Sequence, residues 1–147
     1  MTYEKIIIGI GILIGISLLR KTNPIFLKSI LIGLILSFGL SFFSEKLLIN
    51  ISFFSFGILT FLFTVYNGLK KRWLNLTIGF FAFISFLFSF LHYPFANELK
   101  LLMLIPILSY LAIFKSLDKH KSELSILTML VSYELNEFLR LTEQWIN

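Results

Sequence analysis

Four residues of different chemistry stand close together in the stretch 91–98, namely His92, Tyr93, Asn97 and Glu98. They place an imidazole, a phenol, a carboxamide and a carboxylate within seven residues. A histidine near a membrane interface changes its charge near neutral pH and can pass a proton to a carboxylate or to water. Histidine and tyrosine are equally typical of the interfacial belts of membrane proteins, and Pro94 would simply end a helix. The sequence leaves both interpretations of this cluster open.

Other patterns of catalysis or metal binding are absent from the sequence. It contains no cysteine, and its two histidines, His92 and His120, lie far apart. The acids form no HExxH motif, no clustered ExxH pair and no carboxylate-rich loop, so the sequence predicts no metal site. It also has no phosphate-binding glycine loop and no nucleophile elbow. We therefore expect no cofactor, and an enzymatic activity has no support from the sequence.

Between residues 6 and 114 the chain consists of five long apolar stretches separated by short charged loops. A hydrocarbon core about 30 Å thick is crossed by roughly 20 helical residues. The composition agrees, because 57% of the residues are hydrophobic, 14% are charged and the mean hydropathy is +0.89. The sequence predicts an all-α polytopic transmembrane bundle in residues 1–123. Its five expected spans are Lys5–Leu19, Ile25–Phe43, Leu47–Tyr66, Trp73–Leu91 and a fifth from Phe95 or Leu99 to Phe114.

The C-terminal segment 124–147 has a different pattern, in which about ten apolar residues are followed by a polar half that contains Glu134, Glu137 and Glu143. At 100° per residue its large apolar side chains gather in an arc of roughly 120°, which predicts an amphipathic helix. This helix either lies along the cytoplasmic membrane surface or crosses the bilayer as a sixth span with its acids against protein. Three carboxylates with a single arginine favour contact with protein, or folding back on the chain's own basic loops, over contact with anionic lipid.

Small residues recur on one face of several expected spans. Glycines four residues apart in the first span, and a serine or glycine at every fourth position of the second, let neighbouring helices approach closely. Close helix packing is therefore predicted at the following residues: Gly11, Gly15, Ser29, Gly33, Ser37, Ser41 and Gly79. The phenylalanines of the spans are expected to fill gaps against these residues and to face lipid tails elsewhere.

The distribution of lysine and arginine predicts the orientation in the membrane. The first, third and fifth loops contain Arg20, Lys21, Lys70, Lys71, Arg72, Lys115, Lys119 and Lys121, against Lys5, Lys46 and Lys100 on the opposite side. Positively charged loops stay in the cytoplasm, so the N-terminus is expected outside and the odd-numbered loops inside. The same rule accounts for the net charge of +5, and we therefore do not expect nucleic-acid binding.

The stretch from Phe88 to Asn97 resembles a sequence element of a known family. It is similar to the Phe-Lys-x-x-His-Trp-Pro-Gly-Ala-Asn element in the L subunit of the gliding-motility and type IX secretion motor and in related membrane proteins, within a match of about Ile78 to Phe114. Phe88, His92, Pro94, Ala96 and Asn97 are identical. The resemblance implies a multi-pass protein of a bacterial inner membrane. Ser89 and Phe95 stand where the family has lysine and glycine, and the family's carboxylate in the following helix falls near Ser109, so the resemblance does not imply motor activity.

These observations favour an accessory or assembly subunit of an envelope membrane complex, with the lipid bilayer and other membrane subunits or further copies of the chain as partners. The alternative is a small transporter or channel for an ion or a neutral solute. It is supported by Pro106, which is expected to kink the fifth span or to free a carbonyl, and by a possible duplication at a shift of 46 residues that aligns Gly11 with Gly57. A third possibility is an enzyme that acts on lipid through His92 and Glu98.

Overall fold

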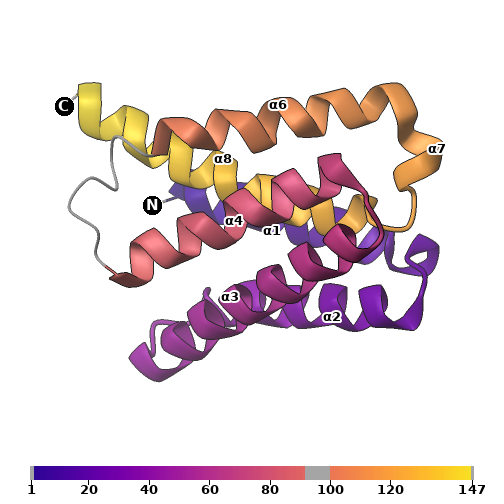
Figure 1. Ribbon diagram of the computed structural model, residues 1–147. Coiled ribbons are helices and arrows are strands. Elements are labelled where there is room, and N and C mark those ends of the chain that lie inside the picture. The colour runs from indigo at the N-terminus through magenta and orange to yellow at the C-terminus, as the bar shows by residue number, and fades with distance from the viewer. Residues whose placement is uncertain (1, 92–99, 147) are drawn as a thin grey trace.

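The computed structural model describes residues 2–91 and 100–146, and every regular element in these ranges is a helix (Figure 1). The α-helices are α1 (Thr2–Ser17), α2 (Ile25–Leu40), α3 (Lys46–Leu69), α4 (Trp73–Leu91), α6 (Leu104–Ile113), α7 (Leu117–His120) and α8 (Leu124–Ile146). Three short 3₁₀ turns, η1 (Leu19–Lys21), η2 (Lys100–Met103) and η3 (Phe114–Ser116), extend or join them. The predicted all-α fold is confirmed.

Three helical stretches are long and apolar enough to cross a membrane, namely Lys46–Leu69, Trp73–Leu91 and Leu101–His120. They correspond to the third, fourth and fifth expected spans and indicate a membrane protein. α1 and α2 have sixteen residues each. Each of them rises about 24 Å, which is less than the roughly 30 Å of a hydrocarbon core. α2 ends at Leu40, before the predicted Phe43, because residues 41–43 form a turn.

Pro106 lies in the first turn of α6, directly after η2. The amide groups of a first turn have no acceptor within the helix, so a proline there removes no hydrogen bond. The α-helical part of this stretch begins only two residues before the proline, and the kink or free carbonyl predicted from the sequence stays a prediction.

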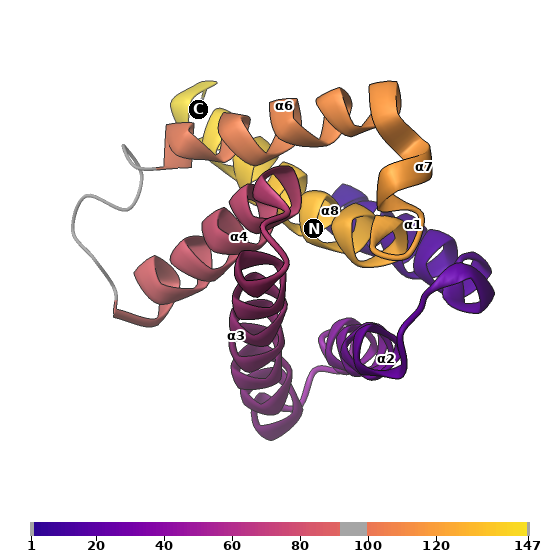
Figure 2. The ribbon, with the colours of Figure 1, turned by 45° about the vertical axis from the view of Figure 1, so that its right-hand side comes forward.

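α8 occupies the centre of the bundle. It packs against α1, α2, α4 and α6, and Figure 2 shows it between α1, α4 and α6. It runs antiparallel to α1: Tyr3 near the start of α1 bonds Glu143 near the end of α8, and Thr22 just after α1 bonds Ser125 near the start of α8. The last helix of the chain is therefore enclosed by the earlier ones.

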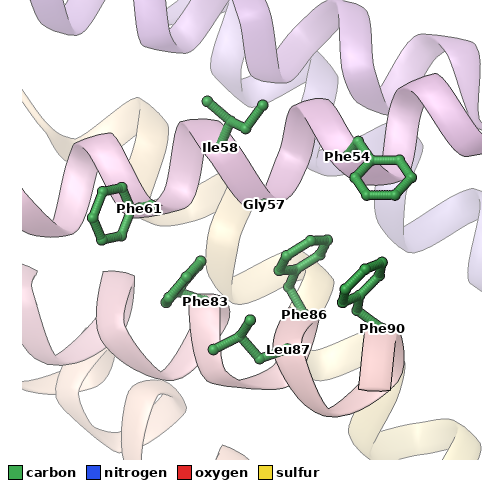
Figure 3. Close-up of a pocket in the computed structure, with 8 residues that line it drawn as sticks. All are labelled: Phe54, Gly57, Ile58, Phe61, Phe83, Phe86, Leu87 and Phe90. Carbon is green, nitrogen blue, oxygen red and sulfur yellow. The ribbon is translucent and has the colours of Figure 1, made fainter. Parts of the chain in front are cut away.

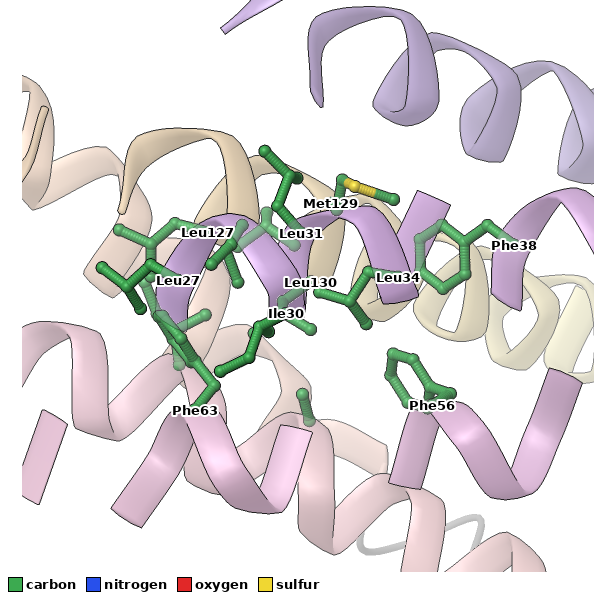
Figure 4. Packing of buried hydrophobic residues seen from close by; sticks show 14 of the residues in the cluster. Leu27, Ile30, Leu31, Leu34, Phe38, Phe56, Phe63, Leu127, Met129 and Leu130 are labelled. Carbon is green, nitrogen blue, oxygen red and sulfur yellow. The ribbon is translucent and has the colours of Figure 1, made fainter. Parts of the chain in front are cut away.

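The main apolar core lies where α2, α3 and α8 meet (Figure 4). α2 contributes a face that repeats every three or four residues, including Leu27, Leu31 and Leu34, all fully buried. Phe63 of α3 and Leu130 of α8 complete this layer and are also fully buried. This contact fixes α8 against the hairpin formed by α2 and α3.

Two serines join α2 to α3 by a reciprocal pair of hydrogen bonds. The Ser37 hydroxyl donates to the Ser52 carbonyl oxygen, and the Ser52 hydroxyl donates to the Ser37 carbonyl oxygen, both at 2.6 Å. One turn away, a Cβ added at Gly33 would lie 2.9 Å from a methyl carbon of Leu59. Small side chains on α2 therefore bring the two backbones into close contact.

Gly11 and Gly15 perform the same role between α1 and α8. A Cβ at Gly11 would lie 2.7 Å from the Ser132 hydroxyl oxygen, and one at Gly15 would lie 2.9 Å from the Met129 sulfur. Ser132 is also held in place, because its hydroxyl donates to the Thr128 carbonyl oxygen at 2.8 Å. Gly9, two residues earlier on α1, has no neighbouring atom within 4 Å of its Cβ position.

Replacing Gly11 by valine should lower the stability of the bundle, since overpacking of this kind costs typically about 1–3 kcal/mol. Gly9→Val is the matched control, because it places the same side chain on the same helix in open space. We expect a lower midpoint of thermal unfolding in detergent for Gly11→Val and little change for Gly9→Val. Equal midpoints for the two variants would contradict the close contact between α1 and α8.

Candidate functional site

The buried polar groups of α8 form the candidate functional site. Five polar residues of α8 and of the position just before it are at most 7% exposed, namely Glu123, Ser125, Glu134, Asn136 and Glu137. Leu135, which lies between two of them, is 37% exposed. The acidic side of α8 therefore faces the interior of the bundle. The apolar residues Ile126, Leu127 and Leu130 are buried as well, so α8 is enclosed on both its polar and its apolar sides.

At the end of the bundle that carries the basic loops, Glu123 forms an ion pair with Arg72, which lies between α3 and α4. The Glu123 side chain is fully buried, whereas that of Arg72 is 37% exposed. The second carboxylate oxygen of Glu123 has no hydrogen-bond partner among the described residues. Beside this pair, the hydroxyls of Thr22 and Ser125 lie 2.8 Å apart. These contacts hold the first turn of α8 against two loops of the bundle.

Glu134 lies halfway along α8 and is fully buried. The Ser85 hydroxyl of α4 donates to its Oε2 at 3.1 Å, and its Oε1 has no partner among the residues that the structure describes. A carboxylic group in such a position keeps one oxygen available for a proton, a water molecule or a cation. An ionisable side chain inside a membrane bundle is rare and is a functional hypothesis by default.

From Glu134 toward the end of α8, charged groups follow one another. Glu137 lies one turn further and accepts a hydrogen bond from Arg140 at 2.9 Å. The Arg140 guanidinium also lies 3.5 Å from the carboxylate of Glu4 on α1. The Tyr3 hydroxyl donates to Glu143 at 2.5 Å. Polar groups of α1 and α8 thus connect the middle of the bundle with the end at which α1 begins.

In the opposite direction the face of α8 is apolar. Glu123 and Glu134 are eleven residues apart, which is close to three whole turns and about 16 Å of rise, so both lie on nearly the same face. Ile126, Leu127 and Leu130 stand between them and are fully buried. Hydrophobic constrictions of this kind close membrane pathways by excluding water. An apolar layer therefore separates the central carboxyl group from the end of the bundle that carries the basic loops.

The residues predicted for close packing are distributed over several contacts. Gly11 and Gly15 face α8, Gly33 and Ser37 face α3, and a Cβ at Gly79 of α4 would lie 2.7 Å from the Thr64 hydroxyl oxygen of α3. Ser29 and Ser41 lie outside these contacts. Their side chains are exposed, and they donate to the carbonyl oxygens of Ile25 and Phe38 in their own helix. The predicted row on α2 therefore has only its two middle members in a helix contact.

The cluster of His92, Tyr93, Asn97 and Glu98 falls outside the described residues. No group of three or more histidine, cysteine or acidic side chains that could hold a metal ion occurs within the ranges 2–91 and 100–146.

Sequence reasoning did not identify Arg72, Ser85, Glu123 and Glu134 as a set. From the sequence, Arg72 was interpreted as part of the positively charged loops that set the membrane orientation, and Ser85 as a small residue for helix packing. The acids of the C-terminal helix were interpreted as contacts to protein. One signal was available, namely the spacing of eleven residues between Glu123 and Glu134, which aligns two carboxylates on a helix whose first half is apolar. Only the path of α8 through the bundle brings Ser85 and Arg72 to them.

Comparisons with known proteins add no relative, because no family model, no curated protein and no solved structure matches this chain at a significant level. The resemblance of Phe88–Asn97 to the motor-subunit element stays a prediction from the sequence.

Cysteine pairs test the path of α8, and the natural absence of cysteine makes the chain suitable for them. Thr22→Cys with Ser125→Cys should form a disulfide on mild oxidation, and Tyr3→Cys with Glu143→Cys should be joined by a short bismaleimide linker. Mass spectrometry of the digested protein would detect both products. A helix that lay on the membrane surface would give the first product without the second. Tyr3→Cys with Asp118→Cys is the control and should give none, since these residues belong to opposite ends of the bundle.

Proposed function

We propose that the chain is an integral protein of a bacterial inner membrane in which α1, α2, α3, α4, the stretch 101–120 and α8 all cross the bilayer. Three of these segments are long and apolar enough by themselves. The orientation of α8 supports its assignment as a sixth span, because Leu135 points outward while its acidic neighbours point inward. Lipid tails surround such a protein, so this orientation places apolar groups in the lipid and ionisable groups inside the bundle.

Six spans that cross the membrane in alternating directions place the basic loops on one side of it. With the N-terminus outside, the loops that contain Arg20, Lys71 and Lys119 face the cytoplasm, as the positive-inside rule requires. The antiparallel packing of α1 and α8 then places Glu143 beside Tyr3 on the outer side. The ion pair between Arg72 and Glu123 belongs to the cytoplasmic end.

With this placement in the membrane, the chain acts as a small transporter or channel that moves protons or small cations. The buried carboxyl group of Glu134 carries this proposal, since it has one oxygen held by Ser85 and one oxygen without a partner among the described residues. Polar contacts among Glu4, Arg140 and Glu137 extend from the outer side to Glu137, which lies one helical turn from Glu134. Proton relays in membrane proteins are built from such carboxyl groups at mid-depth.

The described conformation corresponds to a state that is closed toward the cytoplasm. Leu127 and Leu130 are fully buried between Glu134 and Glu123, so a proton or cation reaches the cytoplasmic end only when water enters this layer. Such an opening requires a small displacement of α8 against α2 and α4, of the kind by which packed helices slide in transport proteins.

A second candidate function is an assembly subunit of an envelope complex. One observation favours it: on α2 the side chain of Ser29 is exposed, and Gly39 has no atom within 4 Å of its Cβ position. Small residues left open on a membrane-facing helix allow a helix of another subunit to approach closely. The acids of α8 no longer require a partner protein, since groups of the same chain contact them.

The transport proposal is tested in liposomes that contain the purified protein, a pH-sensitive dye and a potassium diffusion potential. We expect proton uptake well above that of empty liposomes, and a loss of at least about tenfold for Glu134→Gln, which keeps the shape of the side chain and removes its titration. Glu45→Gln, at an exposed acid before α3, is the matched control and should keep the wild-type rate. Flux in Glu134→Gln equal to the wild-type rate would exclude this carboxyl group from the mechanism.

Purification from the native membrane in a mild detergent tests the assembly proposal. An assembly subunit should elute with a second protein or as a defined oligomer, and Gly39→Trp should weaken this association by placing a large ring on the open face of α2. A single monodisperse monomer, with no second protein, would argue against this function.

A further inference from the structure

An apolar groove of about 390 Å³ lies on the side of the bundle between α3 and α4 (Figure 3). Its walls consist of five phenylalanine rings together with Ile58 and Leu87, and no polar atom lines it. Ile58 is 61% exposed, which shows that the groove opens sideways and not into the core of the bundle.

The absence of a side chain at Gly57 creates this groove. A Cβ there would lie 2.4 Å from the ring of Phe86, so the ring rests directly against the backbone of α3. Ring pairs across the two helices bound the groove at its ends: the centroids of Phe54 and Phe90 are 5.5 Å apart, and those of Phe61 and Phe83 are 5.3 Å apart. The result is an elongated hollow with aromatic ends.

The groove lies at mid-depth of a helix that is long enough to cross the bilayer. Phe54 and Phe61 are the ninth and sixteenth of the 24 residues of α3. Lys46 begins α3 eight residues before Phe54, about 12 Å along the axis. This distance is slightly less than half of a hydrocarbon core of about 30 Å. A lipid whose head group lies level with Lys46 therefore reaches the groove at Phe54 with the end of its acyl chain, whereas Phe61, about 22 Å from Lys46 along the axis, lies past the midplane.

We propose that this groove binds an acyl chain of a zwitterionic phospholipid whose head group carries a phosphate and an ammonium group. Glu45 and Lys46 are adjacent and exposed at the start of α3, so they present one negative and one positive charge to such a head group. Among the described residues the lining offers contacts only to hydrocarbon, and the ring of Phe54, which is almost half exposed, is positioned to cover the end of this chain. This inference rests on the membrane placement proposed above and is independent of proton transport.

Native mass spectrometry tests the site on protein reconstituted in vesicles of phosphatidylethanolamine and phosphatidylglycerol in equal amounts and then extracted in a mild detergent. The wild type should retain one phosphatidylethanolamine molecule. Ile58→Trp fills the groove and should lower this retention by about tenfold, which corresponds to roughly 1.4 kcal/mol of lost binding. Leu108→Trp on α6 is the matched control, because Leu108 is 62% exposed and lies outside the groove, and it should retain the lipid.

Two further variants keep the test decisive. Leu87→Trp fills the groove from α4 and should repeat the effect of Ile58→Trp if that variant unfolds. Lys46→Gln removes the charge that faces the phosphate and should lower the retention of phosphatidylethanolamine. A wild-type protein without bound lipid, or one that prefers phosphatidylglycerol, would overturn the proposal. So would a dimer that Ile58→Trp converts to a monomer, since a second copy of the chain would then cover the groove. Proton flux is measured separately. A protein that retains no lipid but has normal flux would therefore overturn the lipid site in the groove and leave the transport proposal intact.

Discussion

A carboxylate removed from water needs a hydrogen-bond donor or a positive charge, because an unpaired buried charge costs several kcal/mol. α8 brings two fully buried carboxyl groups into the bundle, Glu123 and Glu134. Arg72 and Ser85 meet this requirement, and they come from the loop before α4 and from α4 itself. The position of α8 relative to α4 is therefore fixed by polar contacts as well as by packing. Any displacement along the axis would separate both pairs at once.

Close approach of the other helices makes the enclosure of α8 possible. Gly11 and Gly15 let α1 lie directly against Ser132 and Met129, and Gly57 and Gly79 bring α3 and α4 together. Dispersion contacts between such surfaces replace the hydrophobic effect, which does not drive helices together in lipid. The reciprocal bonds of Ser37 and Ser52 add polar contacts between backbones that are already close. Small side chains thus decide how much of α8 is covered.

The bundle offers two different chemical environments. Inside, the contacts of Glu134, Glu137 and Arg140 form a polar route along one half of α8, and Leu127 and Leu130 end it. Outside, the groove between α3 and α4 presents only aromatic and aliphatic carbon. The first suits a proton or a small cation, and the second suits a hydrocarbon chain. Both depend on the same glycine-rich contacts, since these set the distance of α3 and α4 from each other and from α8.

The sequence by itself determined the helical class, because long apolar stretches between charged loops allow the backbone to satisfy its hydrogen bonds only within helices. It also determined the limits of most helices, through Pro24, the Ser44-Glu45 turn and the basic loops, and it marked Gly11, Gly33 and Ser37 as positions of small side chains. Only the tertiary structure decided which way α8 faces. Helical periodicity identifies an apolar arc and a polar arc, but it does not say which of them meets the bundle. Here both arcs are enclosed: Leu127 and Leu130 are as fully buried as Glu134. The acids find their partners Arg72 and Ser85 only through contacts between residues about fifty positions apart, which the pattern of one helix does not contain.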